Sequence, residues 1–224
     1  VTPSHHRVHH AINPEYLDKN LAAIFICWDK WFGTFQEELD DVPPVYGITR
    51  PAATWNPIKI NFQHLWLLMK DAWRTRNWWD KLRIWFMPTG WRPQDVEQQY
   101  PVFKIEDVYH FEKYQPPHHA WLPAWSWVQL TFMLCIISFF FGNIAAIGAP
   151  NMFVYGAFIF LSVYAYTELM DQNKYAVLWE ALKNALAIGW IIYTGDWFGM
   201  GTWQSWTIPV LIAYCIVSTL VVAW

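Results

Sequence analysis

Four histidines near the start of the chain are the residues best suited to chemistry, and they are half of the eight in 224 residues: His5, His6, His9 and His10. Thr2 can cap a helix here, and Pro3 suits its first position because the N–H that proline lacks would have no helical partner. At about 100° per residue, the four imidazoles fall within one face of that helix. Neutral imidazole is the commonest metal ligand among side chains. The pattern therefore predicts a metal site.

Two other interpretations place histidines at a chain end, namely a solvated histidine-rich terminus and the remnant of an affinity tag. The His-x-x-His-His spacing, with Pro3 before it and Asn13-Pro14 after it, favours a metal-binding helix over both. A residue before proline is disfavoured in the α conformation, so we expect this helix to end near Asn13. Residues three and four apart are neighbours on a helix, so this face could bind one metal ion or the edge of a two-metal centre.

The motif His6-Arg7-Val8-His9-His10 resembles the last histidine box of the membrane fatty-acid hydroxylase/sterol desaturase superfamily. The resemblance continues through residues 13–20 (NPEYLDKN) and 28–35 (WDKWFGTF), and it includes Tyr46-Gly47-Ile48 and Asn56-Pro57. Together these motifs cover residues 1–60 well, and the resemblance thins after them.

Within this superfamily the chain is most similar to the alkylglycerol monooxygenase branch, in which a long membrane tail follows the third box. The motif Gly90-Trp91-Arg92-Pro93 and the pair Asp171-Gln172 followed by Glu180 also look like that branch. The resemblance implies a di-iron enzyme that activates O₂ and hydroxylates an aliphatic C–H of a membrane lipid. It further implies an ether-lipid substrate and tetrahydrobiopterin as electron donor, although a fatty-acid or carotenoid hydroxylase with another reductant stays open.

For this centre we take His6, His9 and His10 as metal ligands and His5 as a weaker fourth. Imidazole ligands suit iron, and a histidine-rich site without carboxylates differs from the Glu-rich soluble di-iron bundles. Asp18 and Asn20 could hydrogen-bond the ring N–H groups of liganding histidines. An equally good interpretation makes these two residues a capping turn for the next helix.

The chain lacks the two earlier histidine boxes of the superfamily and does not begin with Met. We therefore expect it to be the C-terminal part of a longer protein, or a reduced relative that lost half of its site. The second possibility supports a different function, a non-catalytic membrane subunit that kept one box as a structural metal site or a relic.

The composition is that of an integral membrane protein. Hydrophobic residues make up 55% and aromatic residues 20%, with 18 Trp, whereas charged residues are only 15%, below the quarter usual for soluble domains. A net charge of −3 gives no indication of nucleic-acid binding. The cysteines Cys27, Cys135 and Cys215 lie in separate apolar stretches without zinc or disulfide spacing.

We expect an all-α, multi-pass membrane protein with three parts: residues 1–50 ending a histidine-box domain, 51–120 forming interfacial helices and a loop, and 121–224 forming the membrane domain. The apolar run Leu21–Trp31 is too short to span a bilayer and should be a helix packed under the site or lying in the interface. Residues 56–76 and 78–86 pair Trp and Leu with Lys and Arg, which is typical of helices in the headgroup plane.

Four segments after residue 120 are candidates for membrane helices: residues 125–147, 152–167, 175–193 and 206–224. The third contains Glu180 and Lys183, which can pair at i, i+3. We expect this tail to anchor the protein, to line a lipid channel or to contact subunits, without a catalytic group. Of the 15 Lys and Arg residues, 13 precede Trp121. This bias places the histidine box on the cytoplasmic side of a bacterial inner membrane or the endoplasmic reticulum.

Overall fold

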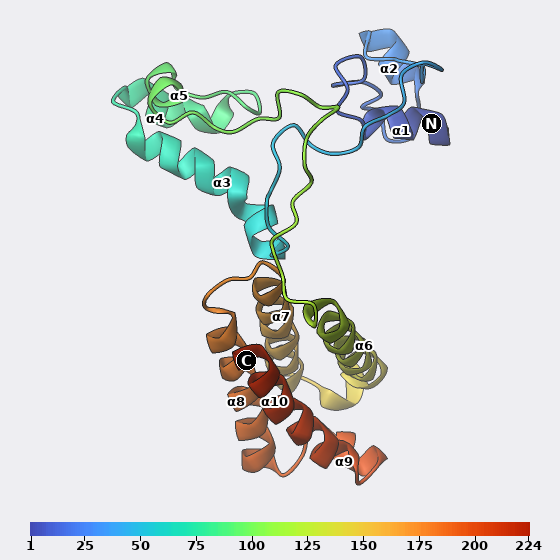
Figure 1. Ribbon diagram of the computed structural model, residues 1–224, viewed down its shortest axis with the longest axis vertical. Coiled ribbons are helices and arrows are strands. Elements are labelled where there is room, and N and C mark those ends of the chain that lie inside the picture. Colours follow the sequence, from blue (N-terminus) through green and yellow to red (C-terminus); the bar gives the residue numbers. More distant parts are fainter. The chain divides into compact units, whose positions relative to one another are not determined.

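The computed structural model describes residues 1–224 and is built of α-helices, as the sequence predicts (Figure 1). The only β pairing is an isolated antiparallel bridge between Ala11 and Tyr46. The chain forms two compact units. Unit 1 contains residues 1–53 and 63–114, and unit 2 contains residues 54–62 and 115–224.

Unit 1 begins with the two short helices α1 (Pro3–His9) and α2 (Cys27–Phe32). The predicted histidine helix is confirmed, but it ends at His9, with His10 as its C-cap, rather than near Asn13. Val8, Ala11 and Tyr16 form a small buried core beneath it. The helix predicted for Leu21–Trp31 is shorter than expected, because residues 21–26 are not helical. Its large apolar side chains are exposed, with Trp31 71% and Phe32 76% accessible.

The remainder of unit 1 is helical in the regions expected to be amphipathic. Helix α3 (Pro57–Arg74) starts in unit 2, and its residues from Gln63 onward belong to unit 1. It is followed by α4 (Trp78–Arg83), the 3₁₀ turn η1 (Ile84–Phe86) and α5 (Gln94–Gln99). Asp71 of α3 is buried and receives two hydrogen bonds from Arg92, at 2.6 and 2.9 Å.

Unit 2 is a bundle of apolar helices. Helices α6 (Leu122–Ile147), α7 (Asn151–Met170) and α8 (Ala176–Thr194) are each long and apolar enough to cross a membrane. The fourth predicted segment contains α10 (Thr207–Ala223), which is apolar but has only 17 residues. The short α9 (Met200–Trp203) precedes it. Helix α7 packs against α6 and α8, and α10 packs against α8.

The outer surface of this bundle is apolar. Helix α6 has no charged residue, and its exposed side chains include Trp127 and Phe141. A helix that is hydrophobic on all sides belongs in a bilayer or a large core, and these helices are mostly exposed. Unit 2 therefore has the surface of an integral membrane domain.

The C-terminal end of α7 forms hydrogen bonds with residues 54–59, the segment that leads into α3. This segment also belongs to unit 2. The buried Glu168 carboxylate accepts hydrogen bonds from Asn56 Nδ2 and Lys59 Nζ, both at 2.6 Å. Asp171 accepts from the backbone N–H of Trp55 at 2.7 Å and from the Thr54 hydroxyl. Burial opposes the charge of Lys59, but its hydrogen bond to Glu168 and the negative charges of Glu168 and Asp171 together raise the pKa of Lys59. These contacts give Asp171, noted in the sequence as a motif residue, a structural role.

Candidate functional site

Helix α1 is fixed at its start by a reciprocal cap between Thr2 and His5. The His5 backbone N–H donates to Thr2 Oγ1 at 3.3 Å, and the Thr2 N–H donates to His5 Nδ1 at 3.2 Å. The His5 ring also meets the Phe35 ring edge-on, with centroids 5.5 Å apart. One of the two ring nitrogens of His5 is thus used to start the helix.

The other three histidines of α1 lie together. The ring centroids of His6 and His10 are 4.5 Å apart, those of His9 and His10 are 5.1 Å apart, and those of His6 and His9 are 6.2 Å apart. Nε2 of His6 lies 3.1 Å from Nε2 of His10. Imidazole nitrogens bind transition metals at about 2.0–2.1 Å, so two nitrogens at this separation could share one ion.

The pair His6 and His10 fits a metal, and the complete ligand set is not assembled by this chain. No group of three or more His, Cys, Asp or Glu side chains is arranged to hold a metal ion. The His9 ring stacks on that of His6 with an interplanar angle of 28°. The structure therefore brings the three predicted ligands to one face, with the Nε2 atoms of His6 and His10 3.1 Å apart and His5 in the helix cap.

The face of α1 that carries Arg7 is bound to the loop after α2. Glu38 accepts from Arg7 Nε at 2.9 Å and from Ser4 Oγ at 2.7 Å. The hydrogen bond from Arg7, assisted by that from Ser4, lowers the pKa of Glu38, and the same bond raises the pKa of Arg7. Val8 is fully buried on the inner side of the helix. These contacts set the rotation of α1 and leave its imidazoles on the outer side.

Asn20 acts on the backbone of the helix rather than on a ring N–H. Its Nδ2 donates to the His5 carbonyl at 3.3 Å and to the Gln36 carbonyl at 2.8 Å, and its Oδ1 accepts from Gln36 N–H at 3.0 Å. Asp18 is exposed and has a left-handed backbone with φ +57°. Asn20 therefore links the backbone of α1 to the backbone at Gln36. Asp18 lies in the turn that precedes Asn20 in the chain.

Asp29 is the carboxylate that sequence reasoning did not single out, although it lies within the motif at 28–35. It is 2% exposed and accepts from Leu21 N–H at 2.8 Å, Ala22 N–H at 3.1 Å and the Thr34 hydroxyl at 2.7 Å. Burial opposes its ionisation, but these three hydrogen bonds, with a smaller contribution from the charge of His9, lower the pKa of Asp29. The available signal was its place in the sequence, because Asp29 and Lys30 interrupt an otherwise apolar run.

A cavity of about 570 Å³ lies beside the histidine pair, lined by His6, Arg7, His10, Tyr46, Gly47 and Ile48. The Tyr-Gly-Ile motif found in the sequence thus lines the same cavity as the imidazoles. This volume is in the range of small-molecule sites, about 300–1,000 Å³. The arrangement could place a bound molecule against His6 and His10.

The remaining histidines have their own surroundings. His110 Nδ1 lies 2.8 Å from Asp107 Oδ2, and His64 is exposed on α3. In unit 2, His118 Nδ1 lies 3.2 Å from the Pro116 carbonyl, and His119 stacks on Trp121. The contact with His110 lowers the pKa of Asp107.

The chain is similar to alkylglycerol monooxygenases. It is 33% identical to the human enzyme over 186 residues, which is 81% of this chain and 40% of the relative. The Xenopus tropicalis enzyme is 30% identical over 186 residues, and the Danio rerio enzyme is 31% identical over 189 residues. Each of these alignments covers 83% of this chain and 41% of the relative. The chain thus spans about 40% of the length of the relatives it matches. No protein-family model and no solved structure matches it.

Proposed function

We propose that this chain belongs to a membrane-bound, O₂-dependent monooxygenase that hydroxylates an aliphatic C–H of a lipid. The single observation that carries the proposal is the pair of imidazole nitrogens of His6 and His10, 3.1 Å apart, beside a cavity. The similarity to proteins named alkylglycerol monooxygenase over most of the chain supports it.

In this proposal His6, His9 and His10 hold iron in a di-iron centre of the fatty-acid hydroxylase/sterol desaturase type. When bound, the iron would supply the O₂ activation that protein side chains cannot perform alone. The chain's own contribution is positional. Arg7 with Glu38, and Asn20 with the His5 carbonyl, hold α1 so that its imidazoles face one side.

The substrate and the electron donor are further parts of the proposal. The name of the relatives supports an ether lipid of glycerol, and the resemblance adds tetrahydrobiopterin as donor, with a fatty acyl substrate and another reductant as the alternative. The three long apolar helices of unit 2 support an integral membrane enzyme. The excess of Lys and Arg before the first of them favours a cytoplasmic site in the bacterial inner membrane or the endoplasmic reticulum.

The test is the iron content of the membrane protein expressed from its complete gene. We expect close to two irons per chain, measured by elemental analysis, and loss of most of it in the variants His9→Ala and His10→Ala. The matched control is His64→Ala, because His64 is exposed on α3 and should leave the iron unchanged. Full iron content in both α1 variants would overturn the ligand assignment.

A turnover assay separates the enzyme from a non-catalytic subunit. The iron-loaded protein, supplied with alkylglycerol, O₂ and a reduced pterin in membranes, should release hydroxylation products, and His10→Ala should abolish them. Iron bound without turnover of an ether lipid or a fatty acid would favour a structural metal site.

A further inference from the structure

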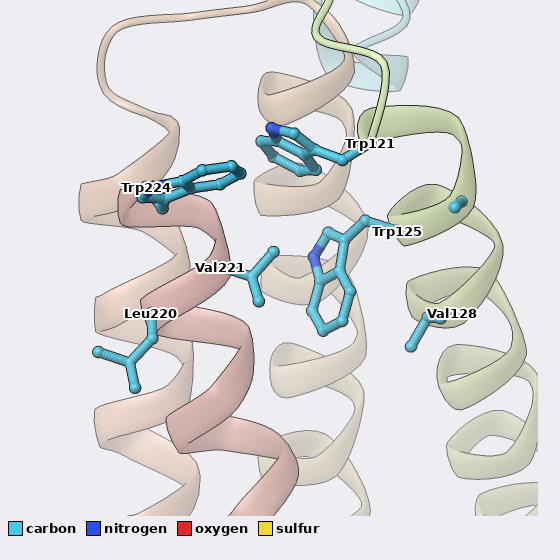
Figure 2. Close-up of a pocket in the computed structure, with 7 residues that line it drawn as sticks. Trp121, Trp125, Val128, Leu220, Val221 and Trp224 are labelled. Atoms are coloured by element: carbon cyan, nitrogen blue, oxygen red, sulfur yellow. The ribbon is translucent and has the colours of Figure 1, made fainter.

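A groove runs between α6 and α10 at one end of the membrane unit, far along the chain from the histidines of α1. Figure 2 shows its labelled lining: Trp121, Trp125, Val128, Leu220, Val221 and Trp224. We call it the α6–α10 groove. Its volume is about 470 Å³ and nearly all of its lining is apolar. The centroids of Trp121 and Trp224 are 6.5 Å apart at its end.

Two buried polar groups on one face of α6 have no hydrogen-bond partner, one on Trp125, which lines the groove, and one on Gln129, a turn further along the helix. They are the indole N–H of Trp125, which is a donor, and the amide oxygen Oε1 of Gln129, which is an acceptor. The two residues are four apart, so they lie one above the other on the helix. Gln129 is 4% exposed, and its Nε2 donates to Ser218 Oγ of α10 at 3.4 Å. Ser218 comes three residues before Val221, which lines the groove.

A buried polar group without a partner is costly, and the cost is greatest inside a membrane domain, where water is scarce. A group that would satisfy both side chains must accept from Trp125 and donate to Gln129. A hydroxyl does both. An ester carbonyl or an ether oxygen accepts only, and it would leave Gln129 Oε1 unpaired.

We propose that the α6–α10 groove binds a lipid with a free hydroxyl group, a long-chain alcohol in the simplest case. The hydroxyl lies between Trp125 Nε1 and Gln129 Oε1, and the chain leaves along Val128 and Leu220, which are 45% and 64% exposed on the outer surface. The inference goes beyond the proposed function and does not depend on it, because all of these residues belong to unit 2.

Entry of the hydroxyl requires a turn of one side chain, because both polar atoms are covered in this structure. The Trp125 ring is the one that can turn, since it is only partly buried and forms the wall of the groove itself. In Figure 2 its indole projects from α6 toward α10, beside Val221. Trp121 and Trp224 then cover the hydroxyl from the aqueous side, where aromatic side chains are favoured.

The test uses the full-length protein in lipid nanodiscs and 1-hexadecanol carrying a photoreactive diazirine near the hydroxyl. The comparison probe is its methyl ether, which accepts a hydrogen bond but cannot donate one. After irradiation, labelled peptides are mapped by mass spectrometry. We expect the alcohol to label α6 and α10 around Val128 and Leu220 about two- to tenfold more than the ether, the difference that one hydrogen bond makes. Unlabelled hexadecanol should compete.

Two variants remove one hydrogen-bonding group each. Trp125→Phe keeps an aromatic ring but removes the N–H, Gln129→Leu keeps the approximate volume, and each should reduce labelling by the alcohol toward that of the ether. The control is Asn143→Leu, because Asn143 lies on the same helix and its amide bonds only the Phe139 carbonyl. Equal labelling by both probes, or unchanged labelling in Trp125→Phe, would overturn the proposal. If Gln129→Leu does not fold, Trp125→Phe alone decides.

Discussion

Lys183 donates a hydrogen bond to Glu180 Oε1 at 2.6 Å, and the two side chains, 4% and 1% exposed, form a buried ion pair within α8. The same oxygen accepts from Asn184 Nδ2 at 3.0 Å and from the Ser218 hydroxyl of α10. Asn184 also donates to Thr219 Oγ1 at 2.9 Å. The pair expected from the i, i+3 spacing is therefore also the centre of a polar network that joins α8 to α10.

Removing one partner of this pair should destabilise the membrane unit strongly. Glu180→Gln leaves Lys183 buried without its counter-charge, a change that costs about 3–5 kcal/mol in typical cases, and the double change to Gln should cost less. Thermal melting of the detergent-purified protein measures both. Turnover per folded molecule should persist in the double variant. Loss of turnover with iron content and melting temperature intact would instead assign the network to the active site.

The ion pair between Arg92 and Asp71 should stabilise unit 1. Their side chains are 8% and 1% exposed, and Arg92 Nη1 also donates to the Tyr100 carbonyl at 2.8 Å. Arg92→Leu should cost about 3–5 kcal/mol, because Asp71 is then buried and unpaired. Hydrogen exchange of α3 peptides would report the loss as faster exchange.

The matched control for Arg92 is His110→Leu. His110 Nδ1 lies 2.8 Å from Asp107 Oδ2, and both side chains are exposed, 83% and 60%, so its removal should leave the exchange of α3 peptides nearly unchanged. Similar exchange rates in the two variants would show that burial does not distinguish these pairs.

Asp95 should make the junction between α3 and α5 sensitive to acid. The hydrogen bond from the Arg76 backbone N–H, at 2.9 Å, outweighs partial burial and, with Thr75, lowers the pKa of Asp95. A lowered pKa stabilises the fold above the unfolded value of about 3.9, and this contribution is lost as the pH falls through the folded pKa. Hydrogen exchange of residues 71–80 should therefore accelerate, beyond its intrinsic pH dependence, below about pH 4. Asp95→Asn should abolish that additional acceleration, and an unchanged profile would contradict the assignment.

Helix α3 should lie in the headgroup region of the bilayer. Trp73 is 86% exposed, and Lys70 lies 5.2 Å from the centroid of the Trp66 ring, a combination typical of interfacial helices. Spin labels at residues 68 and 73 in liposomes should be protected from a water-soluble relaxation agent and accessible to oxygen. Full accessibility to the water-soluble agent at both positions would exclude an interfacial helix, whether it anchors the protein or forms the rim of a lipid channel.

The sequence by itself determined the features that depend on short spacings. Thr2 and Pro3 start α1, the i, i+3 and i, i+4 spacing places His6, His9 and His10 on one face, and long uncharged runs produce the membrane helices. The pairing of Glu180 with Lys183 was predictable for the same reason. Local geometry fixes all of these, because helix periodicity and hydrogen-bond range leave few alternatives.

Tertiary structure decided which polar groups meet across the chain. Sequence spacing could not tell that His5 Nδ1 would accept from Thr2, that Asn20 would bind the His5 carbonyl, or that Asp29 would be buried by three donors. It also gave no sign that Gln129 would reach Ser218, 89 residues away. Such contacts depend on the packing of distant segments, and a polar side chain is satisfied by whichever partner that packing brings within hydrogen-bond distance.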